Sequence, residues 1–216
     1  MPLFGQYRLA GADVWVWKIT ETVDELLAMV PDGCVSSVLS EFASKKRCAE
    51  WLAVRVLVEQ SVGGGVRILY DAAGKPLLEG YCGGISISHT DGYAVVAFSG
   101  SGDVGVDAEL VSRDVLPVAR RFMHPGQLET VLPGDRNFVS LFHWCAKEAL
   151  YKIVGDLGGN FRDNISVPSF ELQDKGRVAV NLVGMEYGGE RDFVADYFVA
   201  DDLLIVLCRR LSDTFV

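Results

Sequence analysis

Two acidic residues that share one face of a short strand are the first candidates for chemistry in this sequence. Gly105-Val106-Asp107-Ala108-Glu109 alternates in character, which predicts a strand with Asp107 and Glu109 on the same side. The glycine permits another backbone to approach closely. Two acids seldom face the same way on a strand without a cation or a basic partner. An ordinary solvated strand face is the alternative interpretation.

A third acid comes from a segment with helical spacing. In Trp144-Cys-Ala-Lys147-Glu148-Ala-Leu-Tyr151-Lys152, the first, fifth and last residues lie four apart on one side of the predicted helix. The alternative is an exposed surface with a Glu148–Lys152 ion pair, worth roughly 0.3–0.5 kcal/mol. The preceding residues are too apolar for a freely exposed helix, which favours a cleft. Three carboxylates from two elements, with lysines beside them, therefore predict a Mg²⁺ site that serves a phosphorylated substrate.

A lysine turn and the end of a strand supply groups that suit a phosphate. Gly74-Lys75-Pro76 predicts a turn, and a later strand ends near Ser88 and His89. Because Ser88 and His89 are adjacent, they point to opposite faces, so a nucleophile–base dyad between them is not expected. We interpret them as hydrogen-bonding and cationic contacts to a phosphate. A turn lysine and a loop histidine without a ligand are the alternative.

Two arginines share a face of the first long predicted helix. Arg47 and Arg55 are eight residues apart, with Trp51 between them. A fork-shaped guanidinium suits a phosphate. The basic run Lys45–Arg47 could hold an anion despite the acidic net charge. Solvated helix arginines are the alternative.

One glycine pattern in the sequence is misleading. Gly100-Ser-Gly102-Asp-Val-Gly105 matches the fingerprint of dinucleotide-binding folds, which requires a strand before it and a helix after it. Here a predicted strand, Val104–Leu110, follows instead. We expect the glycines to form a hairpin loop with Val104–Leu110 as the return strand, and we reject nucleotide binding of that kind.

Composition excludes several classes of protein. The chain has 216 residues, half of them hydrophobic, and a net charge of −9, which argues against a general nucleic-acid or anionic-membrane binder. Its start does not resemble a signal peptide, and its apolar runs are too short to span a bilayer. The odd, scattered cysteines include no Cys-x-x-Cys pair and predict reduced thiols in a cytoplasmic protein: Cys34, Cys48, Cys82, Cys145 and Cys208.

The predicted elements indicate an α+β fold. Each half has a long helix followed by antiparallel strands, which suggests two related lobes, 1–110 and 111–216. Helices are predicted at Thr22–Met29, Val35–Ser61, Leu116–Phe122, Pro125–Leu132 and Asn137–Ile153. Strands are predicted at Val14–Ile19, Arg67–Tyr70, Gly84–Ser88, Tyr93–Ser99, Val104–Leu110, Ser166–Leu172, Arg177–Leu182, Asp192–Ala200 and Leu203–Arg209.

Taken together, the order of these motifs resembles the 4′-phosphopantetheinyl transferases, in particular the long, monomeric type that activates peptide and polyketide synthetases. The resemblance runs from roughly Ser40 to Val167. It is carried by Arg47 and Arg55, Gly74-Lys75-Pro76, Ser86-Ile87-Ser88-His89, Gly105-Val106-Asp107-Ala108-Glu109 and Trp144-x-x-Lys147-Glu148-Ala149-x-x-Lys152.

The resemblance implies a cytoplasmic monomer of two pseudo-symmetric lobes, each a long helix packed on a small antiparallel sheet, with coenzyme A bound in the cleft between them. Asp107, Glu109 and Glu148 match the magnesium ligands, and Glu148 also matches the proposed general base. Lys152 matches a lysine near the coenzyme A pyrophosphate, with Lys147 beside it.

Four further positions match contacts to the phosphates of the coenzyme. Lys75, Ser88 and His89 belong to this set, and Arg47 or Arg55 matches a helix arginine near the adenosine 3′-phosphate. After Lys152 the family often continues with Gly-x-Gly-Leu along the pantetheine channel, from which Ile153–Arg162 departs.

The implied reaction moves phosphopantetheine from coenzyme A to a serine of an acyl or peptidyl carrier protein. Mg²⁺ and lysines would neutralise the charge that develops on the pyrophosphate, and Asp107, Glu148 and Lys152 are the expected catalytic residues. Two alternatives stay open: a Mg²⁺-dependent phosphohydrolase acting on a nucleotide, and a non-catalytic carrier-binding protein.

Overall fold

The computed structural model describes residues 3–9, 11–31, 42, 44–100, 102–129, 131–155, 161–183 and 192–211. The chain divides into two compact units, Met1–Gly102 and Asp103–Val216, called unit 1 and unit 2 below. The division falls ahead of strand β7 (Val104–Leu110), whereas the sequence predicted a boundary after Leu110. The reason is that β7 pairs with a strand of unit 2.

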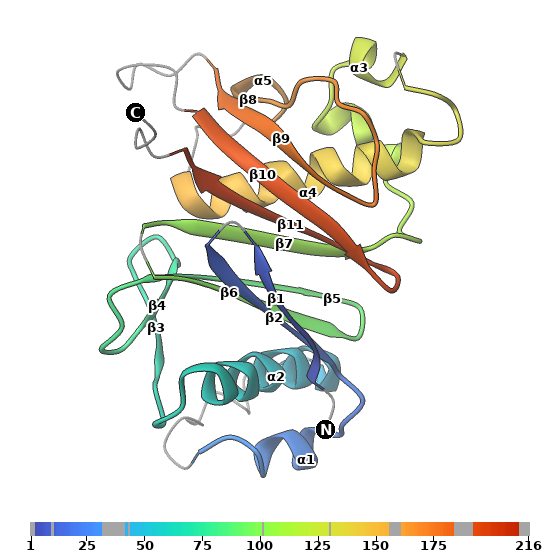
Figure 1. Cartoon of the computed structure of the whole chain (residues 1–216). Coiled ribbons are helices and arrows are strands. Elements are labelled where there is room, and N and C mark those ends of the chain that lie inside the picture. The colour runs from blue at the N-terminus through green and yellow to red at the C-terminus, as the bar shows by residue number, and fades with distance from the viewer. Residues whose placement is uncertain are drawn as a thin grey trace. The chain divides into compact units, whose positions relative to one another are not determined.

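Unit 1 contains a four-stranded sheet, a two-stranded sheet and two helices. The larger sheet is antiparallel with the strand order β1-β2-β6-β5, and β3 pairs with β4 (Figure 1). The elements of unit 1 are β1 (Leu3–Leu9), β2 (Ala12–Lys18), α1 (Val23–Leu27), α2 (Lys45–Val62), β3 (Ile68–Tyr70), β4 (Pro76–Leu78), β5 (Gly84–Thr90) and β6 (Tyr93–Ser99).

Helix α2 packs on the sheet of unit 1 and has defined ends. Ser44 caps its first turn, because the serine side chain accepts a hydrogen bond from the backbone N–H of Arg47 at 3.2 Å. Gly63 ends the helix in a positive-φ conformation that glycine adopts without strain. Leu52, Val56 and their neighbours pack with alternate residues of β2, β5 and β6 to form the core of unit 1. The part of the predicted helix before residue 42 lies outside the described residues.

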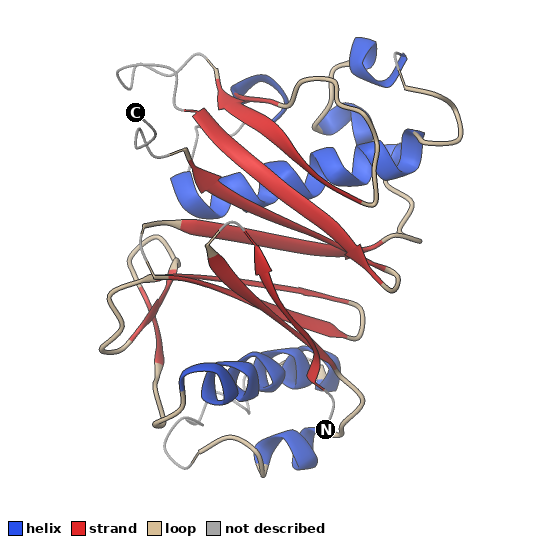
Figure 2. Ribbon diagram, viewed as in Figure 1, coloured by secondary structure: helices blue, strands red, loops and turns tan. Residues whose placement is uncertain are grey.

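Unit 2 is built on a five-stranded antiparallel sheet with the order β7-β11-β10-β9-β8. Figure 2 shows helix α4 running along one face of this sheet. The elements after β7 are the 3₁₀ helix η2 (Leu116–Arg121), α3 (Pro125–Glu129), α4 (Arg136–Val154), α5 (Phe161–Asn164), β8 (Ile165–Ser166), β9 (Lys175–Leu182), β10 (Asp192–Ala200) and β11 (Leu203–Arg210).

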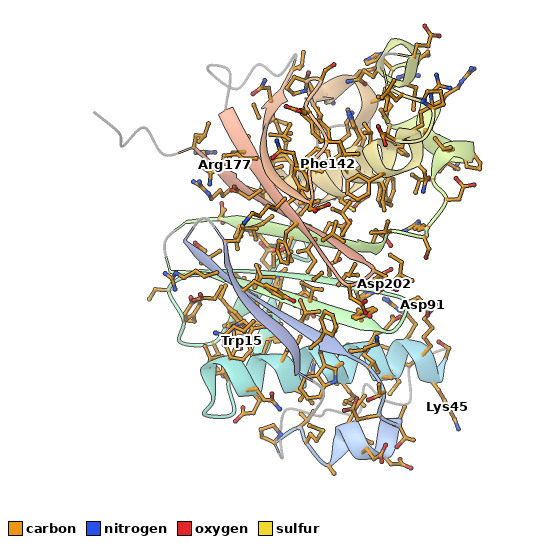
Figure 3. All side chains as sticks on the ribbon, turned by 45° about the vertical axis from the view of Figure 1, so that its right-hand side comes forward. Trp15, Lys45, Asp91, Phe142, Arg177 and Asp202 are labelled. Atoms are coloured by element: carbon orange, nitrogen blue, oxygen red, sulfur yellow. The ribbon has the colours of Figure 1, made fainter. Side chains whose placement is uncertain are left out.

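The core of unit 2 lies between α4 and the sheet. Phe142, labelled in Figure 3, is fully buried there and meets the rings of Tyr197 on β10 and Phe170 at centroid distances of 4.8 and 4.6 Å. Such tilted aromatic contacts add to the burial energy. Within the described residues, no helix is both long and apolar enough to span a membrane.

The α+β class is confirmed, but the predicted hairpin is wrong. Strand β7 pairs with β11, with Gly105 opposite Cys208 and Asp107 opposite Val206. Strand β6 already pairs with β2 on one side and β5 on the other. The glycines before β7 therefore connect two sheets instead of turning one strand back on its neighbour.

Other differences have local causes. The strand predicted over Ser166–Leu172 is present only as β8, because Pro168 lacks the N–H that a sheet ladder needs. Strand β1 and helix α5 were not predicted. Strand β1 joins β2 through Gly11, whose φ of 86° is the kind that a tight hairpin requires.

Gly105 brings β7 into direct contact with α4. A Cβ atom at this position would overlap the backbone carbonyl of Ala149 and lie 3.1 Å from Cγ1 of Ile153. Only glycine therefore lets the strand backbone pack against the helix backbone here. Because side chains alternate along a strand, Asp107 and Glu109 share the α4-facing side with Gly105.

We predict that Gly105→Ala destabilises the protein by about 1–3 kcal/mol, because the added methyl group meets backbone atoms that cannot move alone. Urea unfolding measures this difference. The matched control is Gly126→Ala in α3, where an added Cβ would meet no atom within 4 Å. The control should not destabilise the protein, since alanine favours a helix. Equal stabilities of the two variants would contradict the close packing of β7 on α4.

Candidate functional site

Lys152 connects α4 to the acids of β7. Its Nζ donates to Oδ1 of Asp107 at 2.9 Å and to the carbonyl oxygen of Val106 at 2.8 Å. Asp107 is 7 % exposed and Glu109 is 8 % exposed, so both acids lie largely out of water. A charge-assisted hydrogen bond is strong in such an environment. The strand acid and the helix lysine are thus held together.

The thiol of Cys145 is a further neighbour of Asp107. Cys145 is fully buried on α4, and its side chain forms a hydrogen bond with Asp107. Burial and then the charge of Asp107 raise the pKa of this thiol well above its ordinary value. The thiol therefore stays protonated and forms a neutral hydrogen-bonding neighbour of Asp107. Among the described cysteines, Cys48, Cys82 and Cys208 are also free thiols.

Glu109 is paired with Arg113. The Nη1 of this arginine donates to Oε1 of Glu109, and its guanidinium lies 5.8 Å from the ring centroid of Trp144 on α4. Asn137, in the first turn of α4, donates to the carbonyl of Arg113 at 2.9 Å and accepts from the N–H of Val115 at 3.0 Å. The segment after β7 is therefore fixed to the start of α4.

Glu148 on α4 is the third candidate acid, and with Asp107 and Glu109 on β7 it makes up what we call the acid group. Its pKa is raised above the ordinary value of 4.5, first by burial and second by the negative charge of Asp107. Lys152 and Arg113 act in the opposite direction. A carboxylate with a raised pKa is a better proton acceptor near neutral pH than an ordinary glutamate.

The donor chemistry of these acids fits a magnesium ion. Asp107, Glu109 and Glu148 offer carboxylate oxygens, which Mg²⁺ prefers, and the three acids exceed the two cations, Lys152 and Arg113, that face them. Within the part of the chain that the structure describes, no three His, Cys, Asp or Glu side chains are grouped closely enough to hold a metal. The magnesium site therefore stays a prediction about which oxygens would be ligands.

Lys147 lies apart from this group. It is 1 % exposed, and its Nζ donates to the carbonyls of Phe161 at 2.9 Å and Arg162 at 3.4 Å in α5. Burial lowers its pKa to about 8. Lys147 thus links α4 to α5 through hydrogen bonds. The structure does not place it beside the carboxylates of the acid group.

The phosphate-binding candidates of unit 1 form a second cluster. Nη1 of Arg47 lies 2.7 Å from Nε2 of His89 at the end of β5 and donates to Oε2 of Glu50 at 2.9 Å. The same carboxylate oxygen is 3.6 Å from Nδ1 of His89. We call these residues the Arg47–Glu50–His89 cluster.

The remaining candidates of unit 1 lie outside this cluster. The guanidinium of Arg55 stacks on Trp51, 3.0 Å from its ring centroid, and donates to the carbonyl of Trp51 at 3.1 Å. Lys75 lies in the turn before β4, where its N–H donates to Asp71 Oδ1 at 2.9 Å. Ser88 is buried on β5, on the opposite strand face from His89.

Three residues near these sites were missed by the sequence analysis. Glu50 follows Arg47 by three residues on a predicted helix, a spacing that brings side chains together and therefore offered a signal. Arg113 offered none, because the helix spacing rule does not apply to a residue that follows a strand. Cys145 offered none, because its contact with Asp107 arises from the packing of α4 on β7.

We predict that Glu148→Gln increases stability at pH 7 in the presence of a chelator. Because the pKa of Glu148 is raised on folding, its ionised form destabilises the folded state above that pKa, and the penalty disappears as the pH falls through it toward 4.5. The gain should therefore shrink in acid when urea unfolding is measured from pH 7 to pH 4. The exposed Glu129→Gln serves as the control, and a destabilised Glu148→Gln at pH 7 would contradict the pKa assignment.

His143 predicts a second pH dependence. It is 3 % exposed, and burial lowers its pKa from 6.5 to about 3. The unfolded chain therefore takes up a proton below pH 6.5 that the folded state refuses, so this residue makes stability fall with pH by at most about 1.4 kcal/mol per unit. The unfolding free energy of His143→Leu, relative to that of the native protein, should therefore increase as the pH is lowered from 7 to 5. A constant difference would show that His143 does not titrate this way.

Comparison with known proteins agrees with the resemblance stated from the motifs. The family model of the 4′-phosphopantetheinyl transferase superfamily matches residues 103–208, a segment that contains β7, α4 and every residue of the acid group. No curated protein matches the chain. The family implies transfer of phosphopantetheine to carrier proteins in general. This segment of the chain belongs to the 4′-phosphopantetheinyl transferase superfamily.

Proposed function

We propose that this protein transfers the phosphopantetheine group from coenzyme A to a serine of an acyl or peptidyl carrier protein, with Mg²⁺ as cofactor. The proposal is supported by two interactions between β7 and α4: Lys152 bonds to Asp107, and the charge of Asp107 raises the pKa of Glu148. Both lie inside the segment that matches the family. We propose further that it acts as a cytoplasmic monomer of the long type.

The reaction requires a proton acceptor and a means to stabilise negative charge. The serine hydroxyl oxygen forms a bond to the phosphorus next to pantetheine, and the bond from that phosphorus to the bridging oxygen breaks. Adenosine 3′,5′-bisphosphate leaves with the bridging oxygen. The serine proton passes to the Glu148 carboxylate, directly or through a water molecule, and its raised pKa suits that role.

Cations at the site stabilise the charge of the reacting pyrophosphate. Lys152 contributes a fixed ammonium group, which Asp107 and the carbonyl of Val106 orient. Mg²⁺, held by Asp107, Glu109 and Glu148, would act as a Lewis acid on the phosphoryl oxygens. In unit 1, Arg47 and His89 belong to the same proposal as contacts to the phosphates of the coenzyme, together with Arg55, Lys75 and Ser88.

We predict that Asp107→Ala and Glu148→Gln each lower the transfer rate by on the order of 10²–10³, because each removes an electrostatic contributor to the transition state. The assay incubates the protein with coenzyme A, Mg²⁺ and an apo carrier protein, and follows the mass of the carrier. Glu129→Gln, an exposed acid of the same unit, should transfer at the native rate. A chelator should abolish transfer and added Mg²⁺ should restore it.

The same assay separates the alternatives. A carrier heavier by one phosphopantetheine group supports transfer, whereas phosphate release without carrier modification would indicate a phosphohydrolase. Binding of the carrier without either reaction would indicate a non-catalytic binding module. Native rates in both Asp107→Ala and Glu148→Gln would refute the site.

A further inference from the structure

Glu50 is a buried carboxylate beneath two exposed phosphate-binding candidates. Its side chain is 6 % exposed, compared with 56 % for Arg47 and 38 % for His89. One oxygen, Oε2, accepts from Nη1 of Arg47 at 2.9 Å and faces Nδ1 of His89 at 3.6 Å. The carboxylate thus lies against the arginine and the histidine from the protein side, and both of these side chains remain partly exposed.

The contacts of Arg47 extend beyond the helix pair that its spacing from Glu50 would give. Glu50 and Arg47 are three residues apart on α2, and a surface pair at that spacing is weak. Here the pair extends to β5, because Nη1 of Arg47 also lies 2.7 Å from Nε2 of His89. A long arginine side chain that would otherwise sample several rotamers is held in one place, against a residue of another element.

A neighbouring ion pair fixes the same two elements. Nζ of Lys46 bonds to Oδ1 of Asp91 at 2.7 Å, and Figure 3 shows Asp91 and Lys45 labelled in this part of unit 1. This pair ties the start of α2 to the turn between β5 and β6. The guanidinium of Arg47 itself is held by Glu50 and by His89, and of these two only the buried Glu50 supplies a carboxylate acceptor.

We propose that Glu50 is a positioning residue that holds Arg47 and His89 side by side to receive the 3′-phosphate of coenzyme A. The inference rests on the proposed function and adds to it a residue that sets which form of the coenzyme is preferred. A phosphate dianion gains most from donors that are already aligned, because no side-chain ordering remains to be done on binding.

A positioning role and a simple charge effect predict opposite results. Glu50 is negative, so its neutralisation removes a repulsive charge near an anionic ligand, and a pure charge effect would lower the KM for coenzyme A. If Glu50 instead orients Arg47, loss of its charge-assisted hydrogen bond loosens the guanidinium and raises that KM. The sign of the change therefore distinguishes the two.

The test compares Glu50→Gln with the native protein in the carrier assay, using coenzyme A and 3′-dephospho-coenzyme A. We expect the KM for coenzyme A to rise about tenfold, with kcat and the KM for the dephospho form unchanged. The matched control is Asp13→Asn, which removes a carboxylate paired with Arg8 in the same unit and should leave both KM values unchanged. An unchanged or lower KM for coenzyme A in Glu50→Gln overturns the proposal.

A second variant covers the case in which Glu50→Gln does not fold. Arg47→Lys keeps the positive charge at an exposed position but lacks the planar fork that Glu50 orients, so it should lose the preference for coenzyme A in the same way. When Glu50→Gln and Arg47→Lys are combined, the two increases in the KM for coenzyme A should not multiply, since both changes affect one interaction. Independent effects would overturn the proposal. Failure of the native protein to transfer from coenzyme A would instead refute the proposed function.

Discussion

The packing of β7 directly on α4 is the constraint on which the rest of this account depends. Gly105 has no side chain, so the strand backbone lies against the carbonyl of Ala149. That contact fixes the register of the strand along the helix. The residues two and four positions after the glycine then face α4, where Glu148 and Lys152 lie one helical turn apart. A strand held farther from the helix would leave the same residues without common partners.

The electrostatics of the acid group follow from that geometry. Oδ1 of Asp107 accepts from Lys152, the thiol of Cys145 lies beside the same carboxylate, and Glu109 is paired with Arg113. The ionised form of Glu148 is disfavoured, because the residue is partly buried and close to Asp107. Such a group costs stability. It is also the group best able to accept a proton or a further cation, which is what the proposed reaction requires of it.

The sequence predicted the chemistry of each element better than the connections between them. The α4 helix and the spacing of Asp107 and Glu109 follow from periodicity, which is a local property. The partner of β7 is not local: it pairs with β11, about a hundred residues later in the chain, and the glycines before β7 suggested a hairpin because they look the same in either case.

Periodicity also could not predict which neighbours the helix side chains would contact. Adjacent residues Lys147 and Glu148 carry similar local signals, yet Lys147 bonds to carbonyls of α5 while Glu148 faces the acids. Similarly, Arg47 and Arg55 share a helix face, but Arg47 meets His89 whereas Arg55 stacks on Trp51. In both pairs the outcome depends on what packs against the helix.

The most direct test of the central claim is to locate the divalent ion by NMR. Mn²⁺, used as a paramagnetic substitute for Mg²⁺ in the presence of coenzyme A, should broaden the backbone amide signals of β7 around Asp107 and of α4 around Glu148 together. Excess Mg²⁺ should restore both sets of signals. Broadening of only one of these elements, or of neither, would contradict the claim that the strand acids and the helix glutamate serve one reaction centre.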